Sequence, residues 1–127
     1  MNLNVASWNL RGLNNAEKLE EAGAECNRYK IELLAIQETK MVKEEEKDLD
    51  SGYKFINLPQ KRGSHGGLGF MIRGSFTQYV QGYNRISDRV GIIDIKLDNK
   101  PGNTHIRVLN VYGPTLEKSL KNPNLVE

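Results

Sequence analysis

Residues 31–40 read IELLAIQETK, and this stretch decides how the rest of the sequence is interpreted. Residues 31–36 are mostly apolar and are flanked by charged residues, which predicts a short strand buried in a sheet. Glu38 therefore stands at the C-terminal end of a predicted strand. In sheets with helical crossovers, ligands gather at that end of the strands.

The sequence before this strand predicts another strand followed by a helix. Residues 3–8 alternate apolar residues with small or polar ones, as a strand does, and Asn9 follows at its C-terminal end. We expect a helix to start at Asn14, with Glu17 as its capping-box partner. Residues that recur at three- and four-residue steps would form its apolar face: Leu19, Ala22, Cys26 and Tyr29.

The sequence after residue 40 predicts several further strands joined mostly by short turns. Residues 40–50 are rich in Lys, Glu and Asp, which predicts a solvated loop or a short helix. The predicted strands cover residues 53–58, 68–72, 76–83, 90–97 and 105–111, with turns at 73–75 and 99–103 and a basic loop at 61–67. This order of elements predicts an α/β or α+β fold with a mixed sheet.

Size and composition fit one domain of 127 residues that buries a single core. Cys26 is the only cysteine, which excludes a disulfide framework and a thiolate zinc site and fits a reduced intracellular compartment. We see no signal peptide and no apolar run of membrane-spanning length, so we expect a soluble protein.

Charge is distributed unevenly along the chain. Residues 1–53 hold seven Lys or Arg against eleven Asp or Glu, whereas residues 54–127 hold eleven against five. A basic second half fits a phosphate-bearing partner, because cations that neutralise phosphates release condensed counterions. A solvated basic surface without a ligand explains the same charges equally well.

Four residues have the chemistry of phosphodiester hydrolysis. Glu38, followed by Thr39 and Lys40, could hold Mg²⁺, which prefers oxygen ligands and would neutralise charge on a scissile phosphate. Asn9 stands at the equivalent end of its strand. The alternative for Glu38 is an ordinary solvated strand end.

Tyr112 and Arg89 could contact a phosphate. The phenol of Tyr112 could donate to a phosphate oxygen or position the attacking water, and the alternative is a hydroxyl in solvent. Arg89 could hold a backbone phosphate, and the alternative is a surface ion pair with Asp88 or Asp94.

Five segments together resemble a known family. They read SWNLRGL at residues 7–13, IQETK at 36–40, GGLGFMI at 66–72, SDR at 87–89 and NVYGPT at 110–115. In this order they resemble the endonuclease/exonuclease/phosphatase superfamily, which includes exonuclease III, the apurinic endonucleases and deoxyribonuclease I. Arg11 stands where many apurinic endonucleases carry an acidic residue. The form Trp-Asn-x-Arg-Gly with Gln-Glu-Thr-Lys is typical of the nicking endonucleases of LINE-type and RTE-type non-LTR retrotransposons.

The resemblance implies a fold and a set of site residues. The fold would be the N-terminal half of the two-sheet α/β sandwich of deoxyribonuclease I, a mixed sheet with one main helix on its outer face. Asn9, Glu38 and Tyr112 would be catalytic, with Glu38 and Asn9 holding Mg²⁺ or Mn²⁺. The DNA backbone would be contacted by Arg89, Arg11 and Lys40.

The resemblance also implies that residues 1–127 form a partial domain. The family's second half carries a Gly-Asp-x-Asn segment and a terminal Ser-Asp-His segment, and neither occurs in this sequence. We therefore expect a magnesium-dependent DNA endonuclease domain that is inactive or weak in this chain. We also expect one sheet layer whose inner face is exposed and available for self-association.

Two other functions stay open at this point. One is a non-catalytic remnant that binds nucleic acid or another protein, and the other is a phosphatase acting on inositol phosphates or phospholipids. We expect an intracellular protein, in the nucleus if it derives from a retrotransposon.

Overall fold

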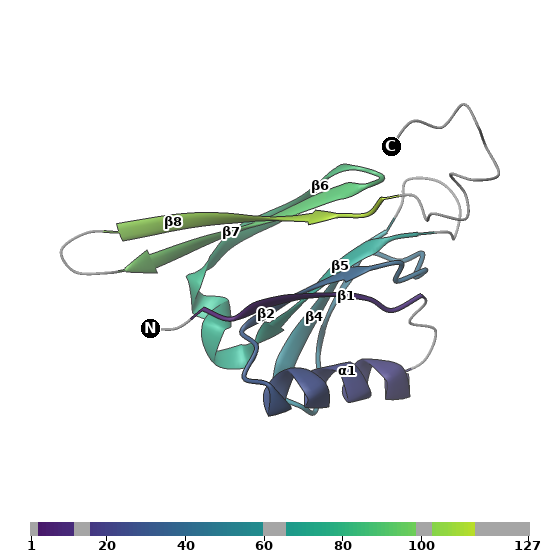
Figure 1. The fold of residues 1–127 in the computed structure, drawn as a ribbon, viewed down its shortest axis with the longest axis horizontal. Coiled ribbons are helices and arrows are strands. Elements are labelled where there is room, and N and C mark those ends of the chain that lie inside the picture. Colours follow the sequence, from purple (N-terminus) through teal and green to yellow (C-terminus); the bar gives the residue numbers. More distant parts are fainter. Residues whose placement is uncertain (1–2, 12–15, 60–65, 99–102, 114–127) are drawn as a thin grey trace.

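The computed structural model of the protein describes residues 3–11, 16–59, 66–98 and 103–113, which form two sheets and a helix (Figure 1). The elements are β1 (Val5–Asn9), α1 (Ala16–Arg28), β2 (Leu33–Gln37), β3 (Glu45–Asp48), β4 (Tyr53–Leu58), β5 (Leu68–Arg73), the 3₁₀ helix η1 (Gly74–Tyr79), β6 (Val80–Ser87), β7 (Val90–Asp98) and β8 (Asn103–Val111). A five-stranded sheet has the order β1-β2-β5-β4-β3, and a three-stranded sheet has the order β6-β7-β8.

The five-stranded sheet is mixed, as the sequence predicts. Strands β1 and β2 are parallel, with Asn9 opposite Gln37, whereas β2, β5, β4 and β3 pair in antiparallel fashion. Helix α1 connects the parallel pair and lies on the outer face of the sheet (Figure 1). Because parallel strands end at the same edge of a sheet, the C-terminal ends of β1 and β2 bring Asn9 and Glu38 to one edge.

The predicted apolar face of α1 is correct at three of its four positions. Leu19, Ala22 and Cys26 are buried against the sheet, but Tyr29 is 64% exposed. Tyr29 comes just after the last residue of the helix, Arg28, and Lys30 then turns the chain with a left-handed backbone at φ of 56°. Asn14, the predicted helix start, lies outside the described residues.

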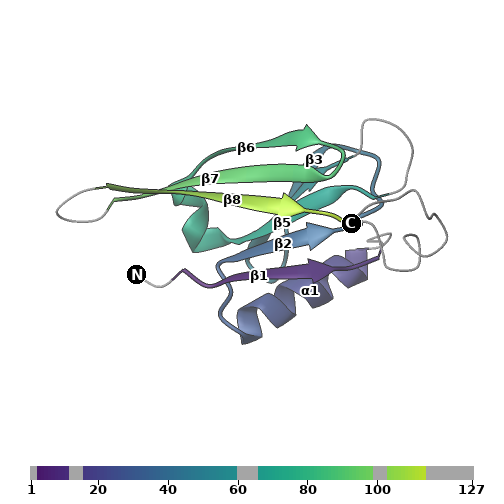
Figure 2. The ribbon, with the colours of Figure 1, turned by 45° about the horizontal axis from the view of Figure 1, so that its top comes forward.

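The two sheets pack face to face around a second core (Figures 1 and 2). The inner face of the five-stranded sheet contributes Leu33, Ala35, Ile56, Leu58, Phe70 and Ile72 to this core, and β7 contributes Ile93, Ile95 and Leu97. The expectation of one sheet layer with an exposed inner face is therefore wrong. Strands β6–β8 cover that face over β2, β5 and β4, so it is not available for self-association.

Two local predictions are also wrong, each for a physical reason. Residues 45–48 form an edge strand with charged, mostly exposed side chains. Such a composition lacks the alternation of apolar and polar residues from which a strand is predicted. Residues 76–79 belong to η1 rather than to a strand, because the chain must leave one sheet and enter the other there. Phe76 is buried at this corner, and the Gly74 N–H donates to the Gly52 carbonyl at 2.8 Å.

The other predicted strands are confirmed within a few residues of their bounds. Most of the predicted basic loop at 61–67 and of the hairpin turn at 99–103 lies outside the described residues. Within the described part of the chain, no helix has the length and apolar character needed to cross a membrane.

Candidate active site

The candidate site lies where the two sheets meet at the ends of their strands. Glu38 follows β2 of the five-stranded sheet, and Tyr112 follows β8 of the three-stranded sheet. The Tyr112 hydroxyl donates to Glu38 Oε1 at 3.4 Å. The two residues are 74 positions apart in sequence, so the packing of the sheets brings them together. Tyr112 is therefore not a strand cap with its hydroxyl in solvent, which was its alternative interpretation.

The loop of residues 38–40 has an unusual backbone. Glu38 and Lys40 both have φ of 55°, in the left-handed region that non-glycine residues rarely adopt. Such conformations cost of order 1–3 kcal/mol each and persist only where the surroundings enforce them. They also collect at functional sites, so the backbone of Glu38 is an independent sign that this loop has a specific task.

Thr39 supplies the anchor that enforces this backbone. Its side chain is fully buried and its hydroxyl donates to Asn57 Oδ1 at 2.7 Å. Its backbone N–H donates to the Gly67 carbonyl at 3.2 Å, and that of Lys40 donates to the Gly66 carbonyl at 2.6 Å. Gly67 has φ of 84°, and a β-carbon there would lie 2.5 Å from the Thr39 hydroxyl. A glycine is therefore needed for the close approach of the two loops.

Asn57 holds the same loop from the sheet. It is fully buried on β4, and its amide nitrogen donates to the carbonyls of Met41 at 3.1 Å and Lys43 at 2.7 Å. One side chain thus binds three points of the segment that follows Glu38. A buried, fully paired amide of this kind fixes backbone geometry more firmly than apolar contacts do.

Asn9 and Arg11 form a turn at the end of β1. The Arg11 N–H donates to Asn9 Oδ1 at 3.1 Å, and Arg11 itself has φ of 53°. The Leu10 N–H donates to the Gln37 carbonyl at 3.2 Å, which ties this turn to the residue before Glu38. The side chains of Asn9, Arg11 and Lys40 are exposed, so their polar groups are accessible to a ligand.

Arg89 adjoins Tyr112 through the backbone. The Tyr112 N–H donates to the Arg89 carbonyl at 2.9 Å, and the Arg89 side chain is exposed. The two carboxylates considered as its alternative partners bind other arginines. Asp88 binds Arg85 at 2.7 Å and Asp94 binds Arg107 at 2.7 Å.

A layer of buried amides lies directly beneath the site. Gln37 Nε2 donates to Asn110 Oδ1 at 2.7 Å and to the Ser7 hydroxyl at 3.0 Å. Asn110 is 1% exposed and Gln37 is 8% exposed. These residues line one side of a hollow of about 350 Å³ between β1, β2 and β8. They connect three strands one or two residues before Asn9, Glu38 and Tyr112.

The donors at the site are of the kind that Mg²⁺ or Mn²⁺ accepts. Glu38 offers a half-buried carboxylate and Asn9 an amide oxygen with a second lone pair. Among the described residues no three His, Cys, Asp or Glu side chains gather into a group that could hold a metal.

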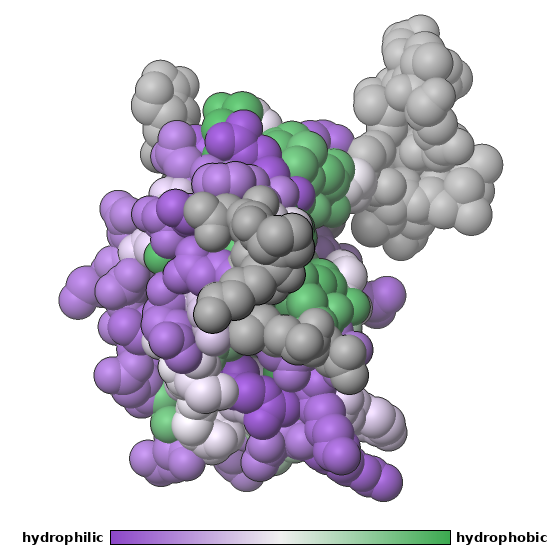
Figure 3. Space-filling view, turned by 90° about the vertical axis from the view of Figure 1, so that its left-hand side faces the viewer, coloured by the Kyte–Doolittle hydropathy of each residue, from purple (hydrophilic) through white to green (hydrophobic). Residues whose placement is uncertain are grey.

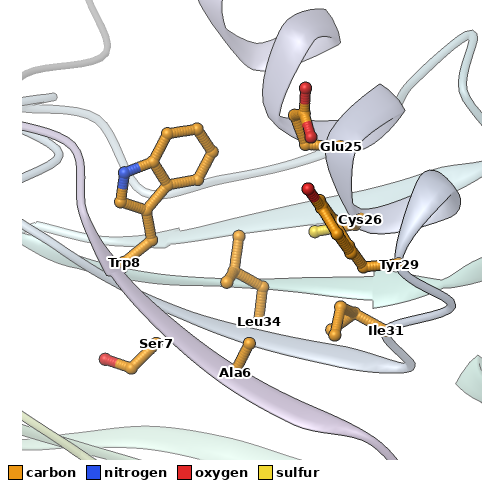
Figure 4. A pocket seen from close by; sticks show the side chains of 8 residues that line it. All are labelled: Ala6, Ser7, Trp8, Glu25, Cys26, Tyr29, Ile31 and Leu34. Carbon is orange, nitrogen blue, oxygen red and sulfur yellow. The ribbon is translucent and has the colours of Figure 1, made fainter.

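A larger hollow lies on the other side of β1, beside α1, and Asn9, Glu38 and Tyr112 do not line it (Figure 4). It measures about 510 Å³ and is lined mainly by apolar and aromatic side chains of β1, α1, β2 and the loop between α1 and β2, with Trp8 and Tyr29 among them. Burial raises the pKa of Cys26, which also lines it, to about 11, and this disfavours the reactive thiolate form. Figure 3 shows that hydrophobic side chains also gather along one side of a mostly hydrophilic face.

The residues that hold the site in place were not predicted in that role from the sequence: Thr39, Asn57, Gln37 and Asn110. All four are polar and buried. Asn57 interrupts a mostly apolar strand, which is a signal that the sequence offered, whereas Asn110 lies in a strand with several polar residues.

Comparisons with known proteins bear on the family and the fold. The chain matches the Endonuclease/Exonuclease/phosphatase family over residues 6–124. It is also similar to the crystal structure of the AP endonuclease LMAP from Leishmania major, with a TM-score of 0.61 and 19% sequence identity. That match covers 88% of this chain and 41% of the other, so this chain spans less than half of its neighbour's length. No curated protein sequence matches the chain.

Proposed function

Because the chain belongs to the endonuclease/exonuclease/phosphatase family, we propose that it is part of a divalent-metal-dependent endonuclease that hydrolyses DNA phosphodiester bonds. The observation that carries this proposal is the meeting of Glu38 and Tyr112 at 3.4 Å across two sheets. A carboxylate and a phenol at one strand edge suit a phosphate and its counter-ion.

Each side chain then has a defined role toward a DNA backbone. Glu38 and Asn9 would hold Mg²⁺ or Mn²⁺ through their oxygens. Tyr112 would donate its hydroxyl proton to a phosphate oxygen, since its present acceptor, Glu38 Oε1, is bound only at 3.4 Å. A bound cation would supply charge neutralisation at the scissile phosphate.

The exposed cations extend this site along a duplex. Arg11 and Lys40 flank Glu38, and Arg89 lies next to Tyr112, so positive charge borders the site from both sheets. Contacts of this kind bind the phosphate backbone without reading sequence. Duplex DNA is therefore the partner that we propose, and binding should weaken as salt is raised.

Residues 1–127 are, on this proposal, the N-terminal part of the catalytic domain. The support is that the chain spans 41% of the AP endonuclease it resembles. Arg11, two positions after Asn9, supports an endonuclease of the retrotransposon type over a cellular repair enzyme. Such a nuclease acts on chromosomal DNA, so we expect the protein in the nucleus, which a fluorescent fusion would test.

The experiment is nicking and binding of supercoiled plasmid by this chain with Mg²⁺, with EDTA as the metal-free control. We expect metal-dependent DNA binding and little nicking, and both should be lost in Glu38→Ala. The matched control is Glu21→Ala, which removes an exposed glutamate of α1 that is not one of the site residues. Equal behaviour of the two variants would overturn the proposal.

A second candidate is a non-catalytic remnant that binds nucleic acid. The observation that favours it is the set of exposed cations at the site, Arg11, Lys40 and Arg89, which can bind a phosphate backbone without a metal. Binding that persists in EDTA and in Glu38→Ala, but is lost in a variant lacking Arg11, Lys40 and Arg89, would identify this function.

A further inference from the structure

The amide of Asn110 occupies a special place between the two sheets. It belongs to β8 of the three-stranded sheet, yet its side chain hydrogen-bonds to β2 and β5 of the five-stranded sheet. At 1% exposure it is one of the few polar side chains buried in the described structure.

Three hydrogen bonds hold this amide. Its nitrogen donates to the Ile36 carbonyl on β2 and to the Gly69 carbonyl on β5, each at 2.9 Å. Its oxygen accepts from Gln37 Nε2 at 2.7 Å. Both amide protons and the oxygen are thus used, and the directions of the bonds fix the position of β8 along β2.

The apolar contacts between the sheets do not fix that position in the same way. Partly buried Ile106 and Val108, the other inward residues of β8, pack against the shared core. Apolar packing is non-directional and tolerates small displacements, whereas a set of three hydrogen bonds does not.

The position of Asn110 in sequence links these bonds to the site. Asn110 comes two residues before Tyr112, and its acceptor Ile36 comes two residues before Glu38. The bonds therefore join β8 to β2 close to Tyr112 and Glu38, whose side chains meet at 3.4 Å. From this geometry we infer that Asn110 is a positioning residue, which sets the distance between the Tyr112 hydroxyl and the Glu38 carboxylate.

The inference rests on the proposed function for its catalytic meaning, but its geometric content can be tested without metal or DNA. All five tyrosines of the chain are replaced by 3-fluorotyrosine, and the ¹⁹F signal of Tyr112 is assigned by its loss in Tyr112→Phe. In the unaltered background, Glu38→Gln should shift the Tyr112 signal, because the carboxylate lies beside the phenol. In the Asn110→Leu background, the same Glu38→Gln change should shift it by less than half as much.

The matched control is Ile95→Val, which trims the core between the same two sheets and leaves the amide in place. It should leave the response of Tyr112 to Glu38→Gln unchanged. If Asn110→Leu does not fold, Gln37→Met removes only one of the three bonds and should still reduce the response. A full response in Asn110→Leu, or in the folded Gln37→Met variant, would overturn the inference.

Metal binding separates the two proposals. Mn²⁺ titration followed by electron paramagnetic resonance should show binding that is lost in Glu38→Gln, because Glu38 is the proposed ligand. No Glu38-dependent Mn²⁺ binding by the unaltered chain would overturn the proposed function, while the ¹⁹F result would still decide the role of Asn110.

Discussion

The two sheets of this protein differ in how they are covered. Every residue of β2 in the five-stranded sheet is buried, with α1 on one face and the three-stranded sheet on the other. The three-stranded sheet is covered on its inner face, whereas its outer face carries Leu109 and Val111 at 57% exposure each. The first sheet holds most of the core, and the second depends on it.

The residues of the candidate site are divided between these two sheets. Glu38 and Asn9 stand on the well-covered sheet, where buried Thr39 and Asn57 fix the loop. Tyr112 stands on the sheet with one covered face, and it reaches Glu38 only through the contact between the sheets. Stability should therefore respond most to changes between the sheets and least to changes on the outer face.

The largest effect is expected from Phe70→Ala. Phe70 is fully buried on β5 between the two sheets, so the cavity should cost about 3–5 kcal/mol of the free energy of unfolding. Urea unfolding followed by tryptophan fluorescence and by far-UV circular dichroism would measure it, with the exposed Ile86→Ala as control. If Phe70→Ala unfolds the three-stranded sheet alone, the two sheets are not one cooperative unit.

A smaller loss is expected from Gly67→Ala. The left-handed backbone and the 2.5 Å approach to the Thr39 hydroxyl should together cost about 2–3 kcal/mol and displace the loop that carries Glu38. Thermal unfolding and Mn²⁺ binding would measure the two effects. The comparison position is Gly82, where a β-carbon meets no atom within 4 Å, so Gly82→Ala should have little effect. Equal losses at both positions would contradict the role of the loop contact.

High pH should weaken the side of the five-stranded sheet that α1 covers. Burial raises the pKa of Cys26 from 9.0 to about 11 and that of Tyr53 from 10.0 to about 12. Between these values the folded chain binds more protons than the unfolded chain, so stability is full below about pH 9 and falls as the pH rises.

The loss attributable to Cys26 should be on the order of 1–2 kcal/mol by about pH 11. Urea midpoints measured across this range should decline less steeply in Cys26→Ala than in the unaltered chain. An unchanged slope would mean that the thiol is not desolvated in the fold.

The smallest effect is expected on the outer face of the three-stranded sheet. Arg107 binds Asp94 across β7 and β8 at 2.7 Å, which holds the pKa of Asp94 below its usual value. The pair is exposed and screened by salt, so Arg107→Ala should leave the urea midpoint nearly unchanged. A loss as large as that of Gly67→Ala would show that this face is covered in solution.

Much of this architecture could be predicted from sequence. The buried strand at 33–37, the parallel arrangement of strand ends with Asn9 and Glu38, and the strands of the second sheet follow from local periodicity. The family inferred from five short motifs is confirmed by the match over residues 6–124. The DNase I-like fold class is confirmed by the similarity to an AP endonuclease structure.

The rest could not be predicted because it depends on contacts distant in sequence. The sequence of residues 74–79 does not indicate that the chain changes sheets there, since Phe76 and Tyr79 would fit a strand equally well. The charged strand β3 is identified only by its pairing with β4. The roles of Asn57 and Asn110 appear only when their partners, 14 to 74 residues away, are brought beside them.

The left-handed backbone of Glu38 and Lys40 has a consequence for how this sequence should change over generations. A glycine at either position would relieve the backbone strain. At position 38 the same substitution would stabilise the fold and remove the carboxylate. On the proposed function, selection for activity is what keeps a glutamate there. In gene copies released from that selection, we expect positions 38 and 40 to drift early toward glycine and asparagine, whereas Gly67 and Asn57 should persist as long as the fold does.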